Sequence, residues 1–347
     1  MSAVARTPEF WHFGRPSVSD IETTAREVEA LGFDGMVLTD SQNLSPDTYV
    51  ALTLAARATR RLMLGPGVTN PLTRHPAVTA GAVASLQSVS DGRAVLGIGR
   101  GDSSLFNIGE RPVGVAAFAE YVSTVQRYLR GEPVQYADYV SPLRWLDDTI
   151  PKAPMDVAGT GPKVLALAAR LAERVSFSVG ADLERLSWAS AHVRDAAKAA
   201  NTTCPSMGAY LNVCVHQDPA RAAELVRAGV GIFAHFTGMK GAPRNRVDGG
   251  DQAVFDRLGE YDKARHGRAD ATHAQALPVE FIKRFAIVGD VDHCVTRLRE
   301  VFATGLDRVV LIGPRADQFG DEAREAMQTL ANEVLPRVRA PWKNSEN

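Results

Sequence analysis

Several short apolar runs in this 347-residue chain end in polar or glycine-rich segments whose side chains could do chemistry. Two of these segments supply a carboxylate, Asp40 after GMVLT and Asp102 in GRGDS, and a carboxylate can hold or transfer a proton. His75, in TRHP, can also exchange a proton near neutral pH, although it precedes Pro76, where capping of a helix is an equal alternative. We predict Asp40, Asp102 and His75 as catalytic residues.

Two glycine-rich loops suit a phosphate group. AGTGPK, residues 158–163, lets backbone N–H groups come close, adds a Thr hydroxyl and the charge of Lys163, and leads into the N-terminus of a helix. GIGRGDS, residues 97–103, places Arg100 between two glycines, and its guanidinium can bind phosphate oxygens in pairs. Such turns also simply join strands to helices, but together they favour a phosphorylated ligand. The spacing does not fit the G-x-G-x-x-G dinucleotide motif, so a Rossmann site is disfavoured.

The composition narrows the kind of partner. The 39 basic and 40 acidic residues nearly cancel, so no net field would attract nucleic acid or an anionic membrane surface. No apolar run approaches the roughly 18 residues of a membrane span, and the first residues lack the apolar core of a signal peptide. We therefore expect a cytoplasmic protein that binds a small-molecule substrate.

The cysteines give no indication of a metal or redox site. Cys204, Cys214 and Cys294 are far apart and lack a CxxC pair or a neighbouring His at ligand spacing. We expect buried or incidental thiols and no bound metal.

The elements that must position these residues alternate between apolar strands and helices. Strands are expected at 9–13, 35–39, 61–68, 93–99, 155–159, 174–180, 207–215 and 306–312. Helices are expected from a capping box of Ser19 and Glu22 to residue 31, and at 47–59, 76–89, 115–129, 162–171, 183–200, 219–228, 291–304 and 318–334.

This alternation predicts a single α/β domain over residues 1–340, a (β/α)₈ TIM barrel, with a disordered tail at 341–347. An irregular excursion, 229–278, separates strands seven and eight. An open doubly wound sheet is the alternative, because periodicity detects strands but not closure. In a barrel the chemistry lies at the carboxyl ends of the strands, where the polar loops described above would meet.

The segments GFDGMVLTDSQN, GPGVTNPLTRHP, LGIGRGDS and AGTGPKVLALAARLAERV resemble the luciferase-like oxidoreductases, especially the branch that includes the coenzyme F420-dependent methylenetetrahydromethanopterin reductases. The resemblance spans nearly the whole chain in family order. It implies a TIM barrel that binds F420, or alternatively FMN, with the phosphate near the loops after strands five and six. It also implies a homodimer, and a non-prolyl cis peptide at Val68 against the ring.

The loops and the resemblance together give the expected site. The cofactor-binding positions are Asp40, Val68, Thr69, Asn70, Gly99, Arg100, Gly101, Gly159, Thr160, Gly161, Pro162, Lys163, Gly180 and Ala181. The substrate pocket is expected at Trp11, Phe13 and Ser41. Relatives that oxidise alcohols commonly have a His where this chain has Ser41, so simple alcohol oxidation is disfavoured. His235, after GVGIFAHF, is a weaker candidate for the site.

The leading hypothesis is hydride transfer between F420 and a small organic substrate, with Asp40 and Asp102 placing protons. A two-component monooxygenase is the first alternative, in which a separate reductase delivers reduced FMN that reacts with oxygen. A flavin-binding barrel without turnover is the second.

Overall fold

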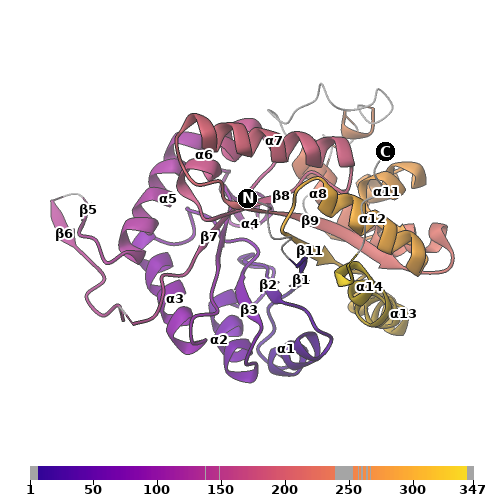
Figure 1. Cartoon of the computed structure of the whole chain (residues 1–347), viewed down its shortest axis with the longest axis horizontal. Helices are drawn as coiled ribbons and strands as arrows, with labels where there is room; N and C mark the ends of the chain where they lie inside the picture. Colours follow the sequence, from indigo (N-terminus) through magenta and orange to yellow (C-terminus); the bar gives the residue numbers. More distant parts are fainter. Residues whose placement is uncertain are drawn as a thin grey trace.

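The computed structural model describes residues 7–136, 138–147, 149–238, 253–256, 258, 261–262, 265 and 267–341. Parallel strands form its centre, with helices around them (Figure 1). In chain order these strands are β1 (Glu9–Gly14), β2 (Gly35–Leu38), β3 (Met63–Pro66), β4 (Leu96–Ile98), β7 (Met155–Gly159), β8 (Arg174–Phe177), β9 (Ser206–Val215) and β11 (Arg308–Ile312).

Neighbouring strands pair in the order β3-β2-β1-β11-β9-β8-β7-β4. The two ends of this path, β3 and β4, are joined by parallel bridges between Leu64 and Ala94 and between Thr69 and Ile98. The strands therefore close into a barrel, which confirms the predicted TIM barrel and shows that the open-sheet alternative was wrong. Burial of the strands from both sides explains why they are nearly continuous apolar runs in the sequence.

The barrel helices occur where the apolar spacing predicts them, with small differences at their ends. They are α1 (Ile21–Ala30), α2 (Thr48–Ala58), α3 (Pro76–Val89), α5 (Val115–Leu129), α6 (Pro162–Leu171), α7 (Leu183–Ala199), α8 (Pro219–Gly238), α12 (Val291–Ala303) and α13 (Ala316–Thr329), the last continued by a π-helical turn, Leu330–Val334, and α14 (Leu335–Arg339). The closing helical segment thus runs farther than the predicted 318–334, and it bends at Gly320, whose φ is 55°.

The predicted capping box at the first helix is wrong. Helix α1 begins at Ile21, its N-cap is Asp20, and no side chain caps it. The Ser19 hydroxyl instead lies 3.1 Å from the hydroxyl of Ser17. The S-x-x-E spacing is therefore present one residue too early to satisfy the first amide groups of the helix.

Helix α8 continues to Gly238, well past its predicted end at residue 228. Gly229 and Gly231 interrupt the apolar pattern, but both are sites of close packing within the helix. A Cβ on Gly229 would lie 2.4 Å from the Asn212 side-chain nitrogen, and one on Gly231 would contact Ala274. The glycines therefore allow close approach to the neighbouring segments rather than ending the helix.

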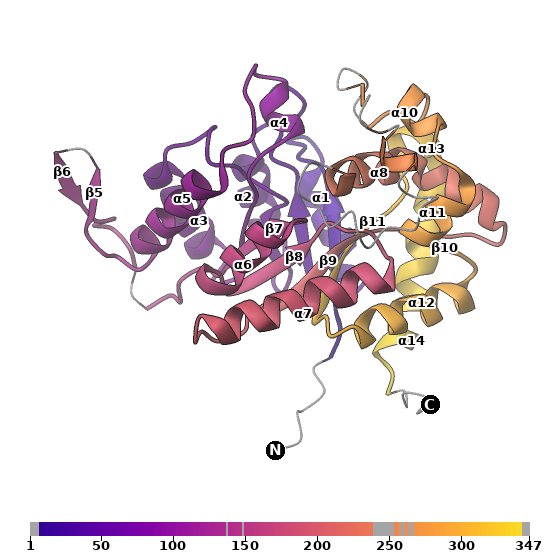
Figure 2. The same cartoon turned by 90° about the horizontal axis from the view of Figure 1, so that it is seen from above.

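The excursion between β9 and β11 contains regular structure that the sequence did not indicate. It includes α10 (Thr272–Gln275), α11 (Val279–Phe285) and β10 (Ile287–Gly289), which extends the sheet by pairing with the end of β9. The stretch before β7, unassigned from sequence, contains the hairpin of β5 (Val134–Tyr136) and β6 (Tyr139–Ser141), which projects away from the barrel in Figure 2. A short helix, α4 (Ser103–Phe106), follows β4.

A buried polar network closes the barrel at the amino ends of its strands. Arg308 is 1% exposed and donates hydrogen bonds to the carboxylate of Asp156 and to the hydroxyls of Ser176 and Ser206. The network fills the barrel interior at the end opposite the expected chemistry. It therefore supports the barrel as structure.

The described helices include none that is long and apolar enough to cross a membrane. Of the predicted tail 341–347, only Pro341 lies within the described residues, and the domain is described from Thr7 onward.

Candidate active site

A cavity of about 850 Å³ opens at the carboxyl ends of the strands, a volume suited to a small organic ligand. Residues from seven of the strand ends line its inner part: Phe13, Asp40, Ser41, Gly67, Val68, Gly99, Arg100, Gly101, Asp102, Gly159, Thr160, Ser178, Tyr210 and Ile312. An outer part reaches between α1 and α13, past Thr24, Val28, Phe319 and Met327. The barrel therefore brings the predicted polar loops to one cavity.

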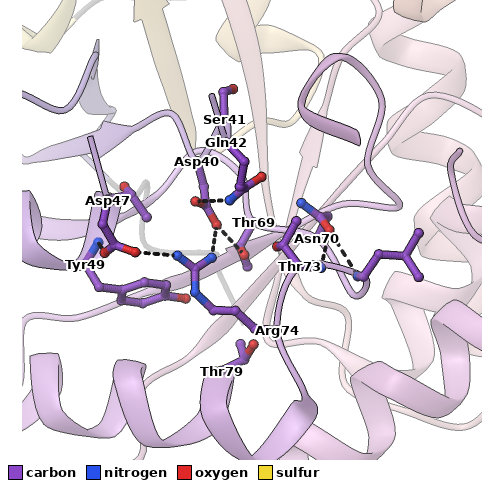
Figure 3. A network of polar contacts seen from close by, with 12 residues as sticks. Asp40, Ser41, Gln42, Asp47, Tyr49, Thr69, Asn70, Thr73, Arg74 and Thr79 are labelled. Carbon is purple, nitrogen blue, oxygen red and sulfur yellow. Dashed lines mark hydrogen bonds and ion pairs between the residues drawn. The ribbon is translucent and has the colours of Figure 1, made fainter. Parts of the chain in front are cut away.

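Asp40, at the end of β2, is held by three donors (Figure 3). One carboxylate oxygen accepts from the Thr69 hydroxyl at 2.7 Å and from the Arg74 guanidinium at 2.5 Å, and the other accepts from the Gln42 amide at 2.8 Å. The Asp40 side chain is only 3% exposed. The acid thus fixes the loops after β2 and β3 relative to each other, and it reaches the cavity wall.

Arg74 makes further contacts that hold it beneath Asp40. Its guanidinium donates to Asp47 at 2.9 Å and lies over the Tyr49 ring, 4.9 Å from the centroid. Asp47 also caps α2 by accepting from the Tyr49 N–H. Burial, followed by the nearby charge of Asp40, raises the pKa of the Tyr49 hydroxyl above its usual range. Tyr49 is therefore a neutral platform for the cation.

Two amide side chains beside this network have an unused polar atom. Within the described residues, Gln42 Oε1 and Asn70 Nδ2 are buried and lack a hydrogen-bond partner. The Asn70 carbonyl, in contrast, accepts from the N–H groups of Leu72 and Thr73. Buried polar atoms without partners are uncommon in folded proteins. Neither side chain is part of the cavity lining, so the two atoms lie behind the wall to which Asp40 belongs.

The segment after β3 bulges toward the cavity. The peptide bond Gly67–Val68 is cis, at the position that the family resemblance indicated. Val68 lines the cavity, and a Cβ on Gly99 would lie 3.0 Å from its side chain. A Cβ on Gly67 would lie 3.4 Å from the Tyr210 hydroxyl. Glycine at these positions lets neighbouring strands approach an apolar surface formed by Val68.

The loop after β7 lies on the same cavity. Gly159 and Thr160 line it, and α6 follows directly with Gly161 as its N-cap and Pro162 at its first position. No side chain among the described residues caps this helix, Pro162 has no N–H, and the Val164 N–H donates to the Gly161 carbonyl at 3.1 Å, so in the first turn the Lys163 N–H is the amide open to an anion. Across the helix, His192 Nε2 lies 3.0 Å from the Pro162 carbonyl oxygen and holds the start of α6.

Asp102 and Arg100 line the cavity after β4, the strand that pairs with β7. The Arg100 guanidinium donates to the Val113 carbonyl at 2.6 Å, which uses one of its five N–H groups. Asp102 lies 3.8 Å from Nε2 of His235 on α8, and the two side chains are 19% and 16% exposed. The weaker sequence candidate His235 is thus brought to the site through Asp102.

Other predicted site residues lie farther away. His75 caps α3 by accepting from the Ala77 N–H at 3.2 Å, and its ring contacts Tyr136. Trp11 points into the barrel, where the Arg174 guanidinium lies 4.7 Å from its ring. Neither lines the cavity, whereas Phe13 and Ser41 do.

Gly180 and Ala181 are enclosed by α11. A Cβ on Gly180 would lie 2.6 Å from the Phe285 ring, and the Ala181 N–H donates to the Phe285 carbonyl at 2.8 Å. Gly161, Pro162 and Lys163 stand beside the cavity lining at the start of α6. The part of the loop nearest the cavity is thus Gly159 and Thr160.

Sequence reasoning gave no role to Arg74 or Tyr210. Arg74 immediately precedes a predicted catalytic His, and its pairing with Asp40 joins positions 34 residues apart. Tyr210 lies inside an apolar strand, where only the inward direction of its side chain distinguishes it. Among the residues that the structure describes, no three His, Cys, Asp or Glu side chains gather in a way that could hold a metal ion.

Comparisons with known proteins agree with this geometry. The sequence profile of the luciferase-like monooxygenases matches residues 3–308. A 5,10-methylenetetrahydromethanopterin reductase of Archaeoglobus fulgidus is 28% identical, over 92% of this chain and 96% of its own length. An F420-dependent glucose-6-phosphate dehydrogenase of Beutenbergia cavernae is also 28% identical, over 90% and 91%. The solved F420-dependent tetrahydromethanopterin reductase of Methanopyrus kandleri superposes with a TM-score of 0.74 at 25% identity, covering 96% of this chain and 99% of that one.

Proposed function

This chain belongs to the luciferase-like monooxygenase family, and on that premise we propose that it is an F420-dependent oxidoreductase acting on a small organic substrate. The Methanopyrus kandleri reductase and the Beutenbergia cavernae dehydrogenase are both F420-dependent enzymes, which supports F420 over FMN. FMN is the alternative cofactor.

One observation carries the proposal. The Val68 bulge, fixed by the Asp40 network, and the open start of α6 lie on the same cavity. A phosphorylated tricyclic cofactor needs an apolar surface for its ring and an anion site for its phosphate, at a fixed distance from each other. The cavity offers both.

The residues present suit such a cofactor. Thr160 and the Lys163 N–H would hold the phosphate, and the Lys163 side chain would add a positive charge. Val68 would support the ring from one face. When bound, F420 would supply or accept the hydride, and the chain would supply orientation and proton placement.

We assign the proton chemistry to Asp102. It lines the cavity, whereas both carboxylate oxygens of Asp40 already accept hydrogen bonds within the network. His75 Nδ1 accepts a hydrogen bond from the Ala77 backbone N–H, and His75 does not line the cavity. Asp40 is therefore proposed to position the Val68 bulge, and Asp102 to hold or move a proton at the substrate.

The substrate would lie between Asp102, Phe13 and Ser41, all of which line the cavity. Phe13 packs edge-on against Tyr210 and Phe233, which makes this part apolar. Ser41 offers a hydroxyl where alcohol-oxidising relatives would have a base, so the proposal favours reduction of an electrophilic carbon.

We also propose that the chain forms a homodimer through an apolar face on α2, α3 and the β5–β6 hairpin. Exposed side chains there include Val50, Val78, Tyr136, Tyr139 and Val140. Exposed apolar side chains of this kind favour a partner, and a symmetric dimer is the commonest closed assembly. Sedimentation equilibrium would give twice the monomer mass, and Tyr139→Glu with Val140→Glu would shift it to the monomer. A wild-type monomer at micromolar concentration would contradict the dimer.

Anaerobic assays with reduced F420 test the proposed activity. A panel of small carbonyl and imine compounds should contain a substrate that returns the absorbance of oxidised F420, with no requirement for oxygen. A product that contains an oxygen atom from O₂, formed only with reduced FMN from a separate reductase, would establish the monooxygenase instead. Binding of F420 without turnover of any compound would favour the non-catalytic barrel.

The cytoplasmic location stays a prediction from sequence.

A further inference from the structure

His235 approaches the candidate acid–base residue from a different element. It lies in the last turn of α8, and its Nε2 is 3.8 Å from a carboxylate oxygen of Asp102, which follows β4. This distance is too long for a hydrogen bond but within reach of an ion pair. Both side chains are less than one fifth exposed, at 16% and 19%. Their attraction is therefore screened less than that of a surface pair.

The His235 ring is fixed by contacts on its other sides. It stacks on Tyr261 with ring centroids 4.3 Å apart and planes at 21°, and its Nδ1 lies 3.4 Å from the Leu258 carbonyl oxygen. A carbonyl oxygen can only accept, so this contact favours a proton on Nδ1. Nε2, the atom nearest Asp102, then carries a proton only when the ring is the charged imidazolium.

Among the described residues, the rings of Tyr261 and His273 are titratable groups on the other side of His235. Burial, followed by the charge of Asp102, raises the pKa of Tyr261 above its usual range, so its phenol stays neutral. Burial lowers the pKa of His273, whose ring lies 3.9 Å from that of Tyr261, so His273 adds little positive charge. The nearby charge of Asp262 acts against this burial and raises the pKa of His273, by less than burial lowers it. Asp102 is therefore the anion that faces Nε2, and the carboxyl end of α8 also favours a cation at His235.

We propose that His235 is a positioning residue for Asp102: as the imidazolium it pairs with the Asp102 carboxylate and holds it turned toward the cavity, and the proton that the pair carries can pass through Asp102 to the substrate. The role rests on the proposed function of Asp102. Deprotonation of His235 releases this attraction, so the reactivity of the site follows the charge of a residue that does not itself line the cavity. None of the described hydrogen bonds, ion pairs or ring contacts of His235 involves the loops after β3 and β7.

The pairing is tested without cofactor or substrate by nuclear magnetic resonance titration of the histidine rings. In Asp102→Asn the pKa of His235 should fall by about 1, because an attraction of about 1 kcal/mol or more between charges roughly 4 Å apart is lost. His216, which forms a similar pair with Glu322 at 3.7 Å on the surface, is the internal control and should not change. An unchanged pKa of His235 in Asp102→Asn would overturn the proposal.

The positioning role is tested by two variants that separate charge from packing. His235→Gln keeps a neutral N–H near Asp102 but cannot become charged, and His235→Phe keeps the stacking with Tyr261. Both should lower kcat/KM about tenfold at the optimum, remove the alkaline decline of its pH profile, and leave F420 affinity within twofold. His216→Gln, the matched control, should behave as wild type.

The outcomes distinguish this inference from the proposed function. Turnover with F420 that is unaffected in both His235 variants, at every pH, would refute the positioning role and leave the proposed function intact. No turnover in the wild type, with the pKa of His235 still dependent on Asp102, would refute the proposed function and leave the ion pair established. A tenfold loss in His235→Gln that His235→Phe does not share would contradict the requirement for charge.

Discussion

The guanidinium of Arg74 lies 2.5 Å from the carboxylate of Asp40, and the two side chains are 13% and 3% exposed. This contact joins the loops after β2 and β3, as Figure 3 shows for Asp40 and Arg74. A buried ion pair of this kind adds little net stability compared with an apolar pair, but removal of one partner leaves an uncompensated charge.

Arg74→Met should therefore be strongly destabilising. We expect the free energy of unfolding to fall by about 3 kcal/mol, because Asp40 loses its charged partner while it stays buried. Urea denaturation measures the change. Arg26→Met is the matched control, since the Arg26–Glu22 pair is about half exposed and should contribute less than about 1 kcal/mol. Equal effects of the two substitutions would contradict a special role for the Asp40 network.

The buried network around Arg308, at the amino ends of the strands, gives a second stability prediction. Asp156→Ala leaves the Arg308 guanidinium buried without its carboxylate and should lower the free energy of unfolding by about 3–5 kcal/mol. Because this network lies at the amino ends of the strands, the F420 affinity of the protein that remains folded should equal that of wild type. Asp321→Ala, which removes an exposed partner of Arg324, should change the free energy of unfolding by less than about 0.5 kcal/mol. Loss of F420 affinity in folded Asp156→Ala would contradict this prediction, because it would show that the Arg308 network also shapes the cavity at the carboxyl ends of the strands.

His12 predicts a pH dependence of stability. Burial lowers its pKa from 6.5 to about 4 in the folded protein, and its Nδ1 has no hydrogen-bond partner among the described residues. Between pH 6.5 and 4, His12 therefore binds a proton in the unfolded chain but not in the folded protein. The contribution of neutral His12 to the free energy of unfolding, present above pH 6.5, is lost as the pH falls toward 4. Relative to His12→Phe, wild type should lose about 3 kcal/mol over this range. Parallel stability curves for the two proteins would refute the assignment.

The start of α6 predicts an effect on cofactor binding alone. Lys163→Ala should weaken F420 binding about tenfold, which corresponds to about 1.4 kcal/mol for one charge-assisted contact to phosphate. Lys283→Ala, on the surface of α11 and paired with Glu280, is the control and should bind as wild type. The thermal midpoints of both ligand-free variants should match wild type. A Lys163→Ala protein with unchanged affinity would place the phosphate elsewhere.

The sequence predicted the barrel because each of its strands is buried on two sides and therefore forms a local apolar run. It also indicated the polar loops at the strand ends, since those residues follow the runs directly. Its errors are local ones in which packing overrides pattern. Gly229 breaks the apolar period of α8 because Asn212 packs against it, and Ser19 has the spacing of a cap although Asp20 occupies that position.

The contacts that define the site could not be predicted, because they join residues far apart in the chain. Asp40 and Arg74 meet only when β2 and β3 pair, and Asp102 meets His235 only when the barrel closes and α8 extends beyond residue 228. For His75, the position before Pro76 allowed either a catalytic role or a role as a helix cap. In the structure its side chain caps α3 by accepting from the Ala77 N–H.

Direct binding of F420 and FMN to the purified protein tests the central proposal most directly. Equilibrium titration, followed by cofactor fluorescence, should give a dissociation constant for F420 at least about tenfold lower than that for FMN, a difference of about 1.4 kcal/mol. Lys163→Ala should narrow this difference, because it removes part of the proposed phosphate site. Tight binding of FMN with no measurable binding of F420 would contradict the proposed cofactor and favour the monooxygenase.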